Sequence, residues 1–249
     1  MDRYGLIGGK LSHSFSASYF SEKFISEGID ASYANYELKS AGEILQLVND
    51  IEGLHGLNVT IPFKIDVLPL MDQLHSSAVE ACAVNTIKIT TTTTGKVLTG
   101  FNTDSLAFEE TLKPLLTTQH AKALILGTGG AASAVKAALQ RLKMDYIMVS
   151  RASKADSISY SEIDKPLLQQ YNVIINCTPS GMFPGIDRMP DLPMQFITSS
   201  NLVYDLIYNP AETLLLKKAK EAGATIKNGL DMLHRQAELA WEIWNDKSL

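Results

Sequence analysis

Two serines near the start of the chain are candidates for binding a ligand. Residues 12–16 read Ser-His-Ser-Phe-Ser directly after the first apolar run, and alternate side chains of an extended segment point to the same side. Ser14 and Ser16 would therefore offer two hydroxyls to a polyhydroxylated ligand. A serine at this position could equally cap the helix that follows. On spacing alone, both roles stay open.

A lysine ends the segment 58–64, which reads Asn-Val-Thr-Ile-Pro-Phe-Lys. The strand-like residues run into Pro62, and proline suits the first position of a helix, so Lys64 is expected in the first helical turn. A positive charge there opposes the helix macrodipole at a cost of about 0.3–1 kcal/mol. This position favours a functional lysine, with a solvated surface lysine as the alternative.

More polar residues stand at the borders of later elements. Asn85 and Thr86 open a predicted strand, and Asn102, Thr103 and Asp104 precede a predicted helix. Either Asn102 or Thr103 could cap that helix, and Asp104 suits its positive first turn. Capping explains the residue type at each position. It does not explain why a lysine, an asparagine and an aspartate should all lie at one edge of the predicted sheet. A ligand site is the other interpretation.

The second half opens with a strand, a glycine turn and a helix, in the sequence Lys-Ala-Leu-Ile-Leu-Gly-Thr-Gly-Gly-Ala-Ala over 122–132. Gly127 permits a tight turn, Gly129 lets the backbone approach a pyrophosphate, and Ala132 allows the helix to pack closely on the strand. The free N–H groups at the helix start would face the phosphates. We therefore predict a dinucleotide site that includes Gly127, Gly129, Gly130 and Ala131.

The next strand indicates which dinucleotide is bound. It ends Met-Val-Ser-Arg over 148–151, with no acidic residue to hold a ribose 2′-hydroxyl. Arg151 takes that place and Lys154 follows, and both cations suit a 2′-phosphate. The sequence therefore predicts NADP rather than NAD, with a solvated arginine as the alternative.

The elements that must position these residues alternate between strand and helix, which indicates an α/β fold. In the first half we expect strands at 4–7, 33–38, 56–61 and 84–90, helices at 18–28 and 41–50, and a hairpin between Ile87 and Leu98 across the threonine tract 90–94. In the second half we expect helices at 105–116 and 212–222, and strands at 123–126, 146–150, 173–177, 202–204 and 224–226.

The predicted architecture has two domains. An N-terminal α/β substrate-binding domain covers 1–101 and is completed by 229–249, and a Rossmann-type doubly wound NADP-binding domain covers 102–228. The last helix, at about 230–246, is expected to return to the first domain with an apolar stripe of Leu230, Leu233, Ala237, Ala240 and Trp244. Trp241 and Trp244 are assigned to the core, with an interface as the alternative.

Composition narrows the class of function. The 249 residues are 45% hydrophobic and 20% charged with a net charge of −5, so no basic field favours nucleic acid or a membrane surface, and a small-molecule partner is expected. Cys82 and Cys177 lack the spacing of a metal site or a disulfide framework, and we expect both to be buried. The first residues resemble no signal peptide and no run reaches transmembrane length, which predicts a cytoplasmic protein, either monomer or homodimer.

Taken together, these segments resemble the shikimate dehydrogenase family over nearly the whole chain. The matching motifs are His13-Ser14-Phe-Ser16, Asn58 to Lys64, Ala83-Val-Asn85-Thr86, Asn102-Thr-Asp104, Asn176-Cys-Thr178-Pro-Ser-Gly181, Tyr204-Asp-Leu-Ile-Tyr208-Asn-Pro210 and Gly229-Leu-Asp-Met-Leu-His-Arg-Gln236. The resemblance implies an NADP-dependent oxidoreductase that reversibly reduces 3-dehydroshikimate to shikimate in aromatic amino-acid and chorismate biosynthesis.

The resemblance also implies roles for individual residues. Lys64 and Asp104 would be the catalytic pair. The substrate would be held by Ser14, Ser16, Thr60, Asn85, Asn102, Tyr208 and Gln236. The cofactor side would add Ser150, Thr178 and Gly229 to the glycine turn, Arg151 and Lys154.

The chain departs from the family pattern at several positions. Ala17 replaces a usual proline, Phe101 a common aspartate, Ser105 a frequent glycine and Asp231 a common glycine, and Ser150-Arg151-Ala152 only partly matches an Asn-Arg-Thr clasp. The changes at Ala17, Phe101 and Ser105 remove no group from the proposed chemistry, whereas those at Asp231 and in the clasp bear on the cofactor preference. The alternatives are a quinate/shikimate dehydrogenase of the same superfamily, and a non-catalytic regulator that binds a nucleotide on the same fold.

Overall fold

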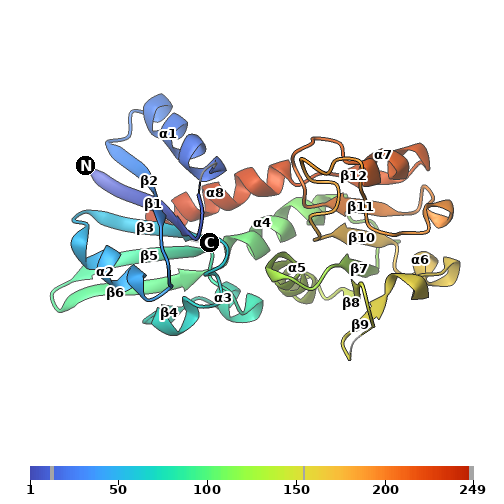
Figure 1. The fold of residues 1–249 in the computed structure, drawn as a ribbon, viewed down its shortest axis with the longest axis horizontal. Coiled ribbons are helices and arrows are strands. Elements are labelled where there is room, and N and C mark those ends of the chain that lie inside the picture. The colour runs from blue at the N-terminus through green and yellow to red at the C-terminus, as the bar shows by residue number, and fades with distance from the viewer. Residues whose placement is uncertain (12–13, 154, 247–249) are drawn as a thin grey trace. The chain divides into compact units, whose positions relative to one another are not determined.

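The computed structural model describes residues 1–11, 14–153 and 155–246. The motif residue His13 and the predicted cofactor ligand Lys154 lie outside the described residues. The chain divides into two compact units, one made of Met1–Thr103 with the chain from Ala237 onward, and one made of Asp104–Gln236. Both units alternate strands and helices (Figure 1), as the α/β prediction requires.

The first unit is built on one mixed sheet. Its strands are β1 (Asp2–Gly8), β2 (Ala31–Glu37), β3 (Leu54–Val59), β4 (Gln73–Leu74), β5 (Thr86–Thr92) and β6 (Gly95–Phe101). They lie in the order β2-β1-β3-β5-β6-β4. Strand β1 pairs in parallel with both neighbours, whereas β5 runs antiparallel to β3 and β6. The β5–β6 pair, with Thr92 opposite Gly95, confirms the predicted hairpin.

The helices of this unit are α1 (Phe15–Glu27), α2 (Glu43–Asp50), α3 (Ser76–Ala81) and the short 3-10 helix η1 (Leu68–Leu70). Local sequence explains both ends of α1. The Ser14 hydroxyl accepts a hydrogen bond from the Ala17 N–H at 3.2 Å, and Gly28 ends the helix in the left-handed region at φ 65°. The cap role of Ser14 is thus confirmed.

Hydrophobic side chains cover both faces of the first sheet. On one face, Ile44 and Val48 of α2 pack with Ile7, Leu57 and other strand residues. On the other face, Phe20 and Phe24 of α1 meet Tyr4 and the end of helix α8 (Leu230–Trp244). The predicted return of the last helix to the first domain is confirmed for the part that carries Ala237, Ala240 and Trp244.

Trp244 belongs to the core, as expected. Its side chain is 5% exposed, its ring stacks on Tyr4 with centroids 4.8 Å apart, and Nε1 donates to the Ile87 carbonyl at 3.0 Å. A Cβ at Gly56 would lie 2.2 Å from that Nε1. Gly56 is therefore needed where the indole lies directly on strand β3.

The second unit is a doubly wound parallel sheet. Its strands are β7 (Lys122–Leu126), β8 (Asp145–Ser150), β9 (Ser157–Ser159), β10 (Val173–Asn176), β11 (Leu202–Asp205) and β12 (Thr225–Lys227). The order β12-β11-β10-β7-β8-β9, with parallel pairing throughout, is that of a Rossmann fold. The topology reverses beside β7, where the predicted glycine turn follows.

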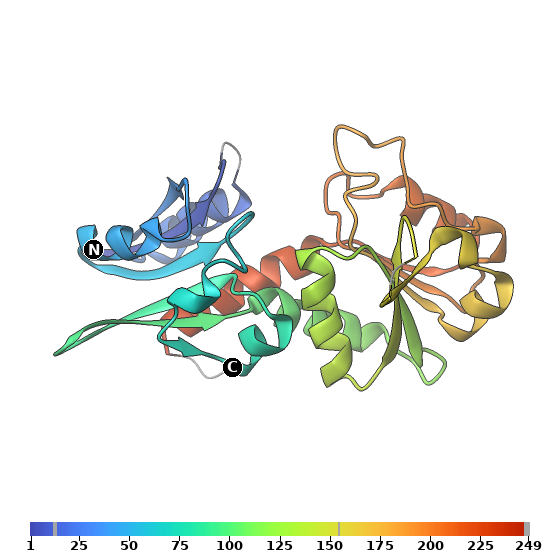
Figure 2. The same cartoon turned by 60° about the horizontal axis from the view of Figure 1, so that its bottom comes forward.

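Helices lie on both faces of this sheet (Figure 2). They are α4 (Thr103–Leu112), α5 (Gly130–Arg141), α6 (Lys165–Gln170) and α7 (Leu214–Glu221), with the 3-10 helices η2 (Lys113–Leu115), η3 (Tyr160–Glu162) and η4 (Met194–Phe196). Leu215 and Leu216 of α7 join one core cluster with Leu124 and Leu126. On the other side, Phe108 of α4 contacts Tyr204 edge to face at 5.1 Å.

Three sequence expectations are wrong in detail. Residues 61–67 form turns rather than a helix that begins at Pro62. A proline after a strand starts a turn as readily as a helix. Here the N–H groups of Phe63 and Leu68 bond three residues back and that of Val67 bonds four residues back, a mixed pattern typical of successive turns, while Phe63 and Val67 enter the core. The dipole argument for Lys64 therefore does not apply.

The other two corrections concern burial. Cys82 is exposed, because it ends helix α3 in the left-handed region at φ 49°; Cys177 is partly buried. Leu230 is 39% exposed and does not join the buried stripe of α8, since it is the first residue of that helix. Among the described residues, no helix is long and apolar enough to cross a membrane.

Candidate active site

Polar residues gather in the first unit where β3, β5 and β6 lie side by side. The backbone joins their segments: the Val59 N–H donates to the Asn85 carbonyl at 2.8 Å, the Val84 N–H to the Lys64 carbonyl at 2.7 Å, and the Asn85 N–H to the Phe101 carbonyl at 3.0 Å. The structure thus brings together the segments that carry Lys64, Asn85 and Asn102. Sheet pairing between distant strands produces this meeting.

The Asn85 side chain forms hydrogen bonds with the first residue of helix α4. Its Oδ1 accepts from the Thr103 N–H at 2.7 Å and its Nδ2 donates to Thr103 Oγ1 at 3.0 Å. Asn85 is only 3% exposed and Thr103 is fully buried. The amide therefore fixes the first residue of α4, and Asp104 follows in the first turn as predicted.

Asn102 is also held by protein groups. Its backbone N–H donates to Ser77 Oγ at 3.0 Å and its Nδ2 donates to the Ala83 carbonyl at 2.9 Å. The side chain is 1% exposed. For Asn102, as for Asn85, these contacts give a structural role, and a substrate contact stays a prediction.

A second polar chain begins at Tyr33, which sequence reasoning missed. The Tyr33 hydroxyl donates to Asn58 Oδ1 at 2.7 Å, and Asn58 Nδ2 reaches Thr86 Oγ1 at 3.3 Å. Burial raises the pKa of Tyr33. A tyrosine in a strand gives no sequence signal for this role, because the partners lie on other elements.

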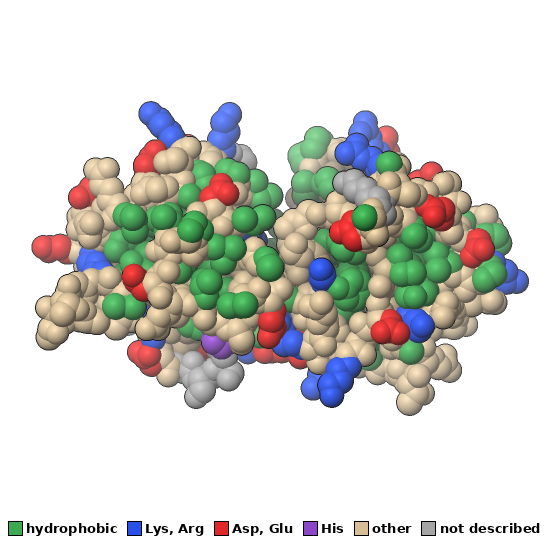
Figure 3. Space-filling model, turned by 90° about the horizontal axis from the view of Figure 1, so that it is seen from below, with side chains coloured by type: hydrophobic (Ala, Val, Ile, Leu, Met, Phe, Trp, Pro, Cys, Tyr) green, Lys and Arg blue, Asp and Glu red, His purple; other side chains and the backbone are tan. Residues whose placement is uncertain are grey.

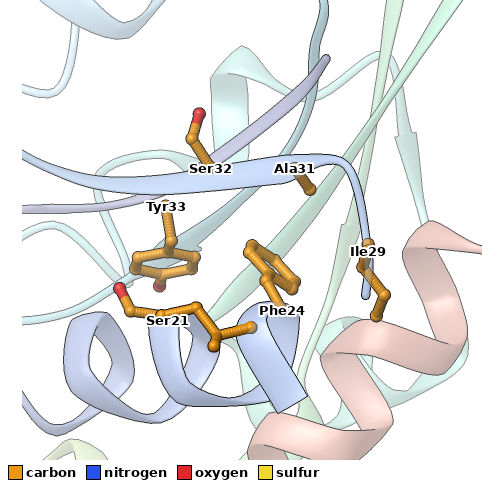
Figure 4. A pocket seen from close by; sticks show the side chains of 7 residues that line it. Ser21, Phe24, Ile29, Ala31, Ser32 and Tyr33 are labelled. Carbon is orange, nitrogen blue, oxygen red and sulfur yellow. The ribbon is translucent and has the colours of Figure 1, made fainter. Parts of the chain in front are cut away.

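A pocket of about 290 Å³ lies between α1 and β2, lined by Ser21, Phe24, Ile25, Ile29, Ala31, Ser32 and Tyr33. Figure 4 shows that the Tyr33 side chain projects from β2 towards α1, on the side of the strand where Phe24 lies. The ring is partly exposed there, whereas its hydroxyl bonds inward to Asn58. None of the residues predicted to bind substrate or cofactor lines this pocket.

The other predicted residues of this unit lie at the start of α1 and directly after β3. Thr60 follows β3, with its N–H donating to the Ile7 carbonyl at 2.9 Å. Ser14 and Ser16 are half-buried at the start of α1, and Lys64 is half-buried in the turns after β3.

In the second unit, the glycine turn has the shape that a pyrophosphate needs. Gly127 has φ 110°, a conformation that side chains rarely adopt. Among the described residues, no atom lies within 4 Å of a Cβ built at Gly129 or Gly130, and no side chain caps the start of α5. Gly129, Gly130 and Ala131 are exposed, so the helix start is open to an anion. These residues fit a dinucleotide phosphate.

Thr178 stands beside this turn, at the end of the neighbouring strand β10. A Cβ at Gly127 would lie 3.2 Å from the Thr178 methyl group. Asn176 fixes Thr178 in place, because its Oδ1 accepts from the Thr178 N–H at 3.0 Å and from Oγ1 at 2.7 Å. The predicted cofactor residues Gly127 and Thr178 therefore meet at the carboxyl ends of β7 and β10.

The buried Asp205 carboxylate joins the end of β11 to the end of the neighbouring strand β10. Asp205 accepts from Asn176 Nδ2 at 2.9 Å, from the Ile207 N–H at 3.1 Å and from Thr213 Oγ1 at 2.7 Å. Burial raises the pKa of Asp205 from its ordinary 3.8 to about 6, although the three hydrogen bonds oppose the rise. Sequence analysis included Asn176 and Asp205 in matching motifs but assigned neither a role, although polar residues that end apolar strands are the signal that could have found them.

The remaining cofactor candidates vary in their surroundings. Ser150 bonds to the Ala152 carbonyl and to Ser157 Oγ, which shapes the loop after β8, and Arg151 in that loop is exposed. A Cβ at Gly229 would lie 2.0 Å from the Leu206 carbonyl oxygen. Close backbone approach therefore explains Gly229, and a contact to cofactor stays a prediction.

Two predicted substrate residues belong to the second unit. Tyr208 is 43% exposed after β11, and Gln236 of α8 donates from Nε2 to the Leu233 carbonyl at 2.9 Å.

Basic and acidic side chains are interspersed on the face shown in Figure 3. Among the described residues, no group of three or more His, Cys, Asp or Glu side chains could hold a metal ion.

Comparison with known proteins gives a consistent result. A family model described as "Shikimate dehydrogenase substrate binding domain" matches residues 6–87. A protein of Halothermothrix orenii named shikimate dehydrogenase (NADP(+)) is 37% identical over 266 residues, which cover 96% of this chain and 89% of that protein.

Solved structures are similar over the full length. The chorismate mutase/shikimate 5-dehydrogenase fusion protein of Clostridium acetobutylicum has a TM-score of 0.83 at 35% identity and covers 100% of this chain and 92% of its own. Shikimate 5-dehydrogenase of Thermus thermophilus, in complex with NADP(H) and shikimate, has a TM-score of 0.84 at 27% identity and covers 99% and 94%.

Proposed function

Because the chain belongs to the shikimate dehydrogenase family, we propose that it catalyses the reversible NADPH-dependent reduction of 3-dehydroshikimate to shikimate, a step of chorismate and aromatic amino-acid biosynthesis. The observation that carries the proposal is the joining of the Lys64, Asn85 and Asn102 segments by backbone hydrogen bonds. These segments lie far apart in the sequence, yet each carries a matching motif.

Lys64 and Asp104 are the proposed catalytic pair. When bound, NADPH supplies the hydride to the ring carbonyl carbon, and the carbonyl oxygen then needs a proton. The Lys64 ammonium group and the Asp104 carboxylate can exchange a proton with that oxygen. Lys64 is half-buried in the turns after β3, and Asp104 lies in the first turn of α4.

The remaining residues bind and orient. Hydroxyl and amide groups suit the carboxylate and hydroxyls of the substrate, and we assign this role to Ser14, Ser16, Thr60, Asn85, Asn102, Tyr208 and Gln236. The glycine turn at Gly127, Gly129, Gly130 and Ala131, with Thr178 beside it, holds the cofactor pyrophosphate. Arg151 holds the 2′-phosphate, with Ser150 and Gly229 as further contacts.

A spectrophotometric assay of nicotinamide reduction tests the proposal. The protein is given shikimate or quinate, each with NADP or NAD, and we expect turnover with shikimate and NADP to exceed the other three combinations. Faster turnover of quinate would identify a quinate/shikimate dehydrogenase instead. Binding of NADP with no turnover of either acid would contradict an enzyme and favour a nucleotide-responsive regulator.

We also propose a cytoplasmic location, and a monomer or homodimer in solution. The proposed cytoplasmic location follows from the small-molecule chemistry of the pathway. Fractionation of cells that express the protein and light scattering of the purified protein test these two points, and a larger assembly would contradict the second.

A further inference from the structure

We propose that Asp205 is a positioning residue for NADP, whose carboxylate holds Asn176 and, through it, Thr178 beside the glycine turn. The inference rests on the proposed function, in which Thr178 contacts the cofactor. Asn176 and Asp205 lie opposite each other at the ends of the paired strands β10 and β11, and both are fully buried. Because neither side chain is open to solvent, their effect on a cofactor must pass through their neighbours.

The Asn176 amide has one orientation that satisfies its partners. Its Oδ1 accepts from the Thr178 backbone N–H at 3.0 Å, and a backbone N–H can only donate. Its Nδ2 therefore faces the other way and donates to Asp205 Oδ1 at 2.9 Å. Burial raises the pKa of Asp205 to about 6, so at pH 8 the group is a carboxylate, which can only accept. A reversed amide would place donor against donor at Thr178 and acceptor against acceptor at Asp205.

Asn176 also sets the rotamer of Thr178. The Thr178 hydroxyl donates to Asn176 Oδ1 at 2.7 Å and accepts from the Ser180 N–H at 3.3 Å. The hydroxyl and the methyl group share Cβ, so the bonds that hold the hydroxyl also place the methyl group. That methyl group would lie 3.2 Å from a Cβ at Gly127. Asn176 therefore fixes Thr178 against the first glycine of the turn.

The same carboxylate oxygen holds the segment that follows β11. Asp205 Oδ1 also accepts from the Ile207 N–H at 3.1 Å, and the Ile207 carbonyl accepts from the Gly229 N–H at 3.1 Å. Gly229 is another of the proposed cofactor contacts. Asp205 Oδ1 is thus the common acceptor behind Thr178 and Gly229, which come from segments far apart in the sequence.

The second carboxylate oxygen has a different partner. Asp205 Oδ2 accepts from the Thr213 hydroxyl at 2.7 Å, and Thr213 Oγ1 caps α7 by accepting from the Leu216 N–H at 3.3 Å. An asparagine at 205 keeps one oxygen for Asn176 and Ile207 and turns its nitrogen to Thr213. A leucine keeps a similar volume but offers no acceptor. These two substitutions separate the bonds of Oδ1 from the charge.

Calorimetric titration of NADP at pH 8 tests the inference without turnover. Asn176→Ala removes the link to Thr178, and we expect the Kd of NADP to rise about ten-fold, as expected for the loss of roughly one or two hydrogen bonds. Asp205→Leu should raise the Kd at least as much, whereas Asp205→Asn should stay within about three-fold of the wild type. In steady-state assays of Asn176→Ala, KM for shikimate should stay within about two-fold.

Asn201→Ala is the matched control. Asn201 directly precedes β11 and is 2% exposed. Its Oδ1 accepts from the Thr198 N–H at 2.9 Å and from Thr198 Oγ1 at 3.3 Å, and its Nδ2 donates to the Leu168 carbonyl at 3.3 Å. Asn201→Ala should lose stability as Asn176→Ala does and keep the wild-type Kd. Equal rises of the Kd in both variants, or an unchanged Kd in Asn176→Ala, would overturn the inference.

A swapped pair tests the Asn176–Asp205 contact even if Asp205→Leu does not fold. Asn176→Asp alone sets two carboxylates against each other and should weaken NADP binding. Adding Asp205→Asn supplies a donor to the new carboxylate and should recover part of the affinity. No recovery, or a ten-fold weaker Kd in Asp205→Asn alone, would refute the role of Asp205. Wild-type protein that binds NADP but oxidises no shikimate would contradict the proposed function, while the Kd comparisons would still decide this inference.

Discussion

Asn85 and Thr103 are joined by a two-point contact, in which the Asn85 amide oxygen accepts the Thr103 N–H at 2.7 Å and the amide nitrogen donates to Thr103 Oγ1 at 3.0 Å. The contact ties the start of strand β5 to the first residue of α4. Because Asp104 is the next residue, any movement of this helix start also moves a proposed catalytic group.

Replacement of Asn85 by alanine should affect both stability and turnover. The Thr103 N–H would lose its acceptor in the interior, which costs about 1–3 kcal/mol, and kcat for shikimate should fall. Denaturant unfolding and steady-state rates measure the two effects. Asn35→Ala is the control, since that exposed amide donates to the Leu11 carbonyl at 3.2 Å; a similar loss in both variants would argue against the helix-start role.

Gly56→Ala should destabilise the first unit strongly. The new Cβ would lie 2.2 Å from Trp244 Nε1, so the indole must shift and its bond to the Ile87 carbonyl is strained or lost. We expect a loss of about 2–4 kcal/mol in the free energy of unfolding, with a change in tryptophan fluorescence. Gly42→Ala, where no atom of the described part of the chain lies within 4 Å of the added Cβ, should cost little, and equal losses would contradict the packing argument.

Lys64→Met should remove catalysis and spare cofactor binding. Loss of an acid–base group lowers kcat by about two or more orders of magnitude, while KM for NADP should stay near the wild-type value. Lys88→Met is the control, because Lys88 lies on β5 of the same unit and pairs with Asp246. An unchanged kcat in Lys64→Met would remove the catalytic assignment.

Arg151→Ala should weaken NADPH much more than NADH. Only NADPH carries the 2′-phosphate that the guanidinium is proposed to bind. The ratio of the KM for NADPH to the KM for NADH should therefore rise by about ten-fold or more. Lys217→Ala removes an exposed cation from α7 and should leave the ratio unchanged. Equal changes for both cofactors in Arg151→Ala would contradict the contact.

Asp205 should make stability depend on pH. Its pKa is raised to about 6 from 3.8, so between these values the folded protein holds a proton that the unfolded chain has released. The contribution of Asp205 to the free energy of unfolding therefore falls as pH rises from about 4 to 6, by on the order of 3 kcal/mol, and is constant above.

Asp205→Asn removes this titration, and Thr213 can turn its hydroxyl to accept from the new amide. Measured by denaturant unfolding, the variant should gain stability relative to the wild type as pH rises from 4 to 7. Asp145→Asn, at an exposed position of β8, should show no such trend. A difference between Asp205→Asn and the wild type that is constant over this range would refute the role of the buried carboxylate.

The sequence by itself determined the order and type of the main elements. Apolar periodicity and glycine positions predicted β7, the turn at Gly127 and helix α5, because these features depend on neighbours in the chain. The same holds for the Ser14 cap, the Gly28 helix end and the β5–β6 hairpin. Lys64 was visible as a polar residue after a predicted strand and Asn85 as one that opens a strand, whereas Thr178 was named only through the family resemblance.

Tertiary structure decided which of these residues share a site and what holds them. The turns at 61–67 replace a helix because Phe63 and Val67 enter a core built from distant strands. The Tyr33–Asn58, Asn85–Thr103 and Asn176–Asp205 hydrogen bonds each join residues from different elements. Local sequence cannot specify such bonds, because a buried donor chooses among acceptors that only sheet order and helix packing bring within reach.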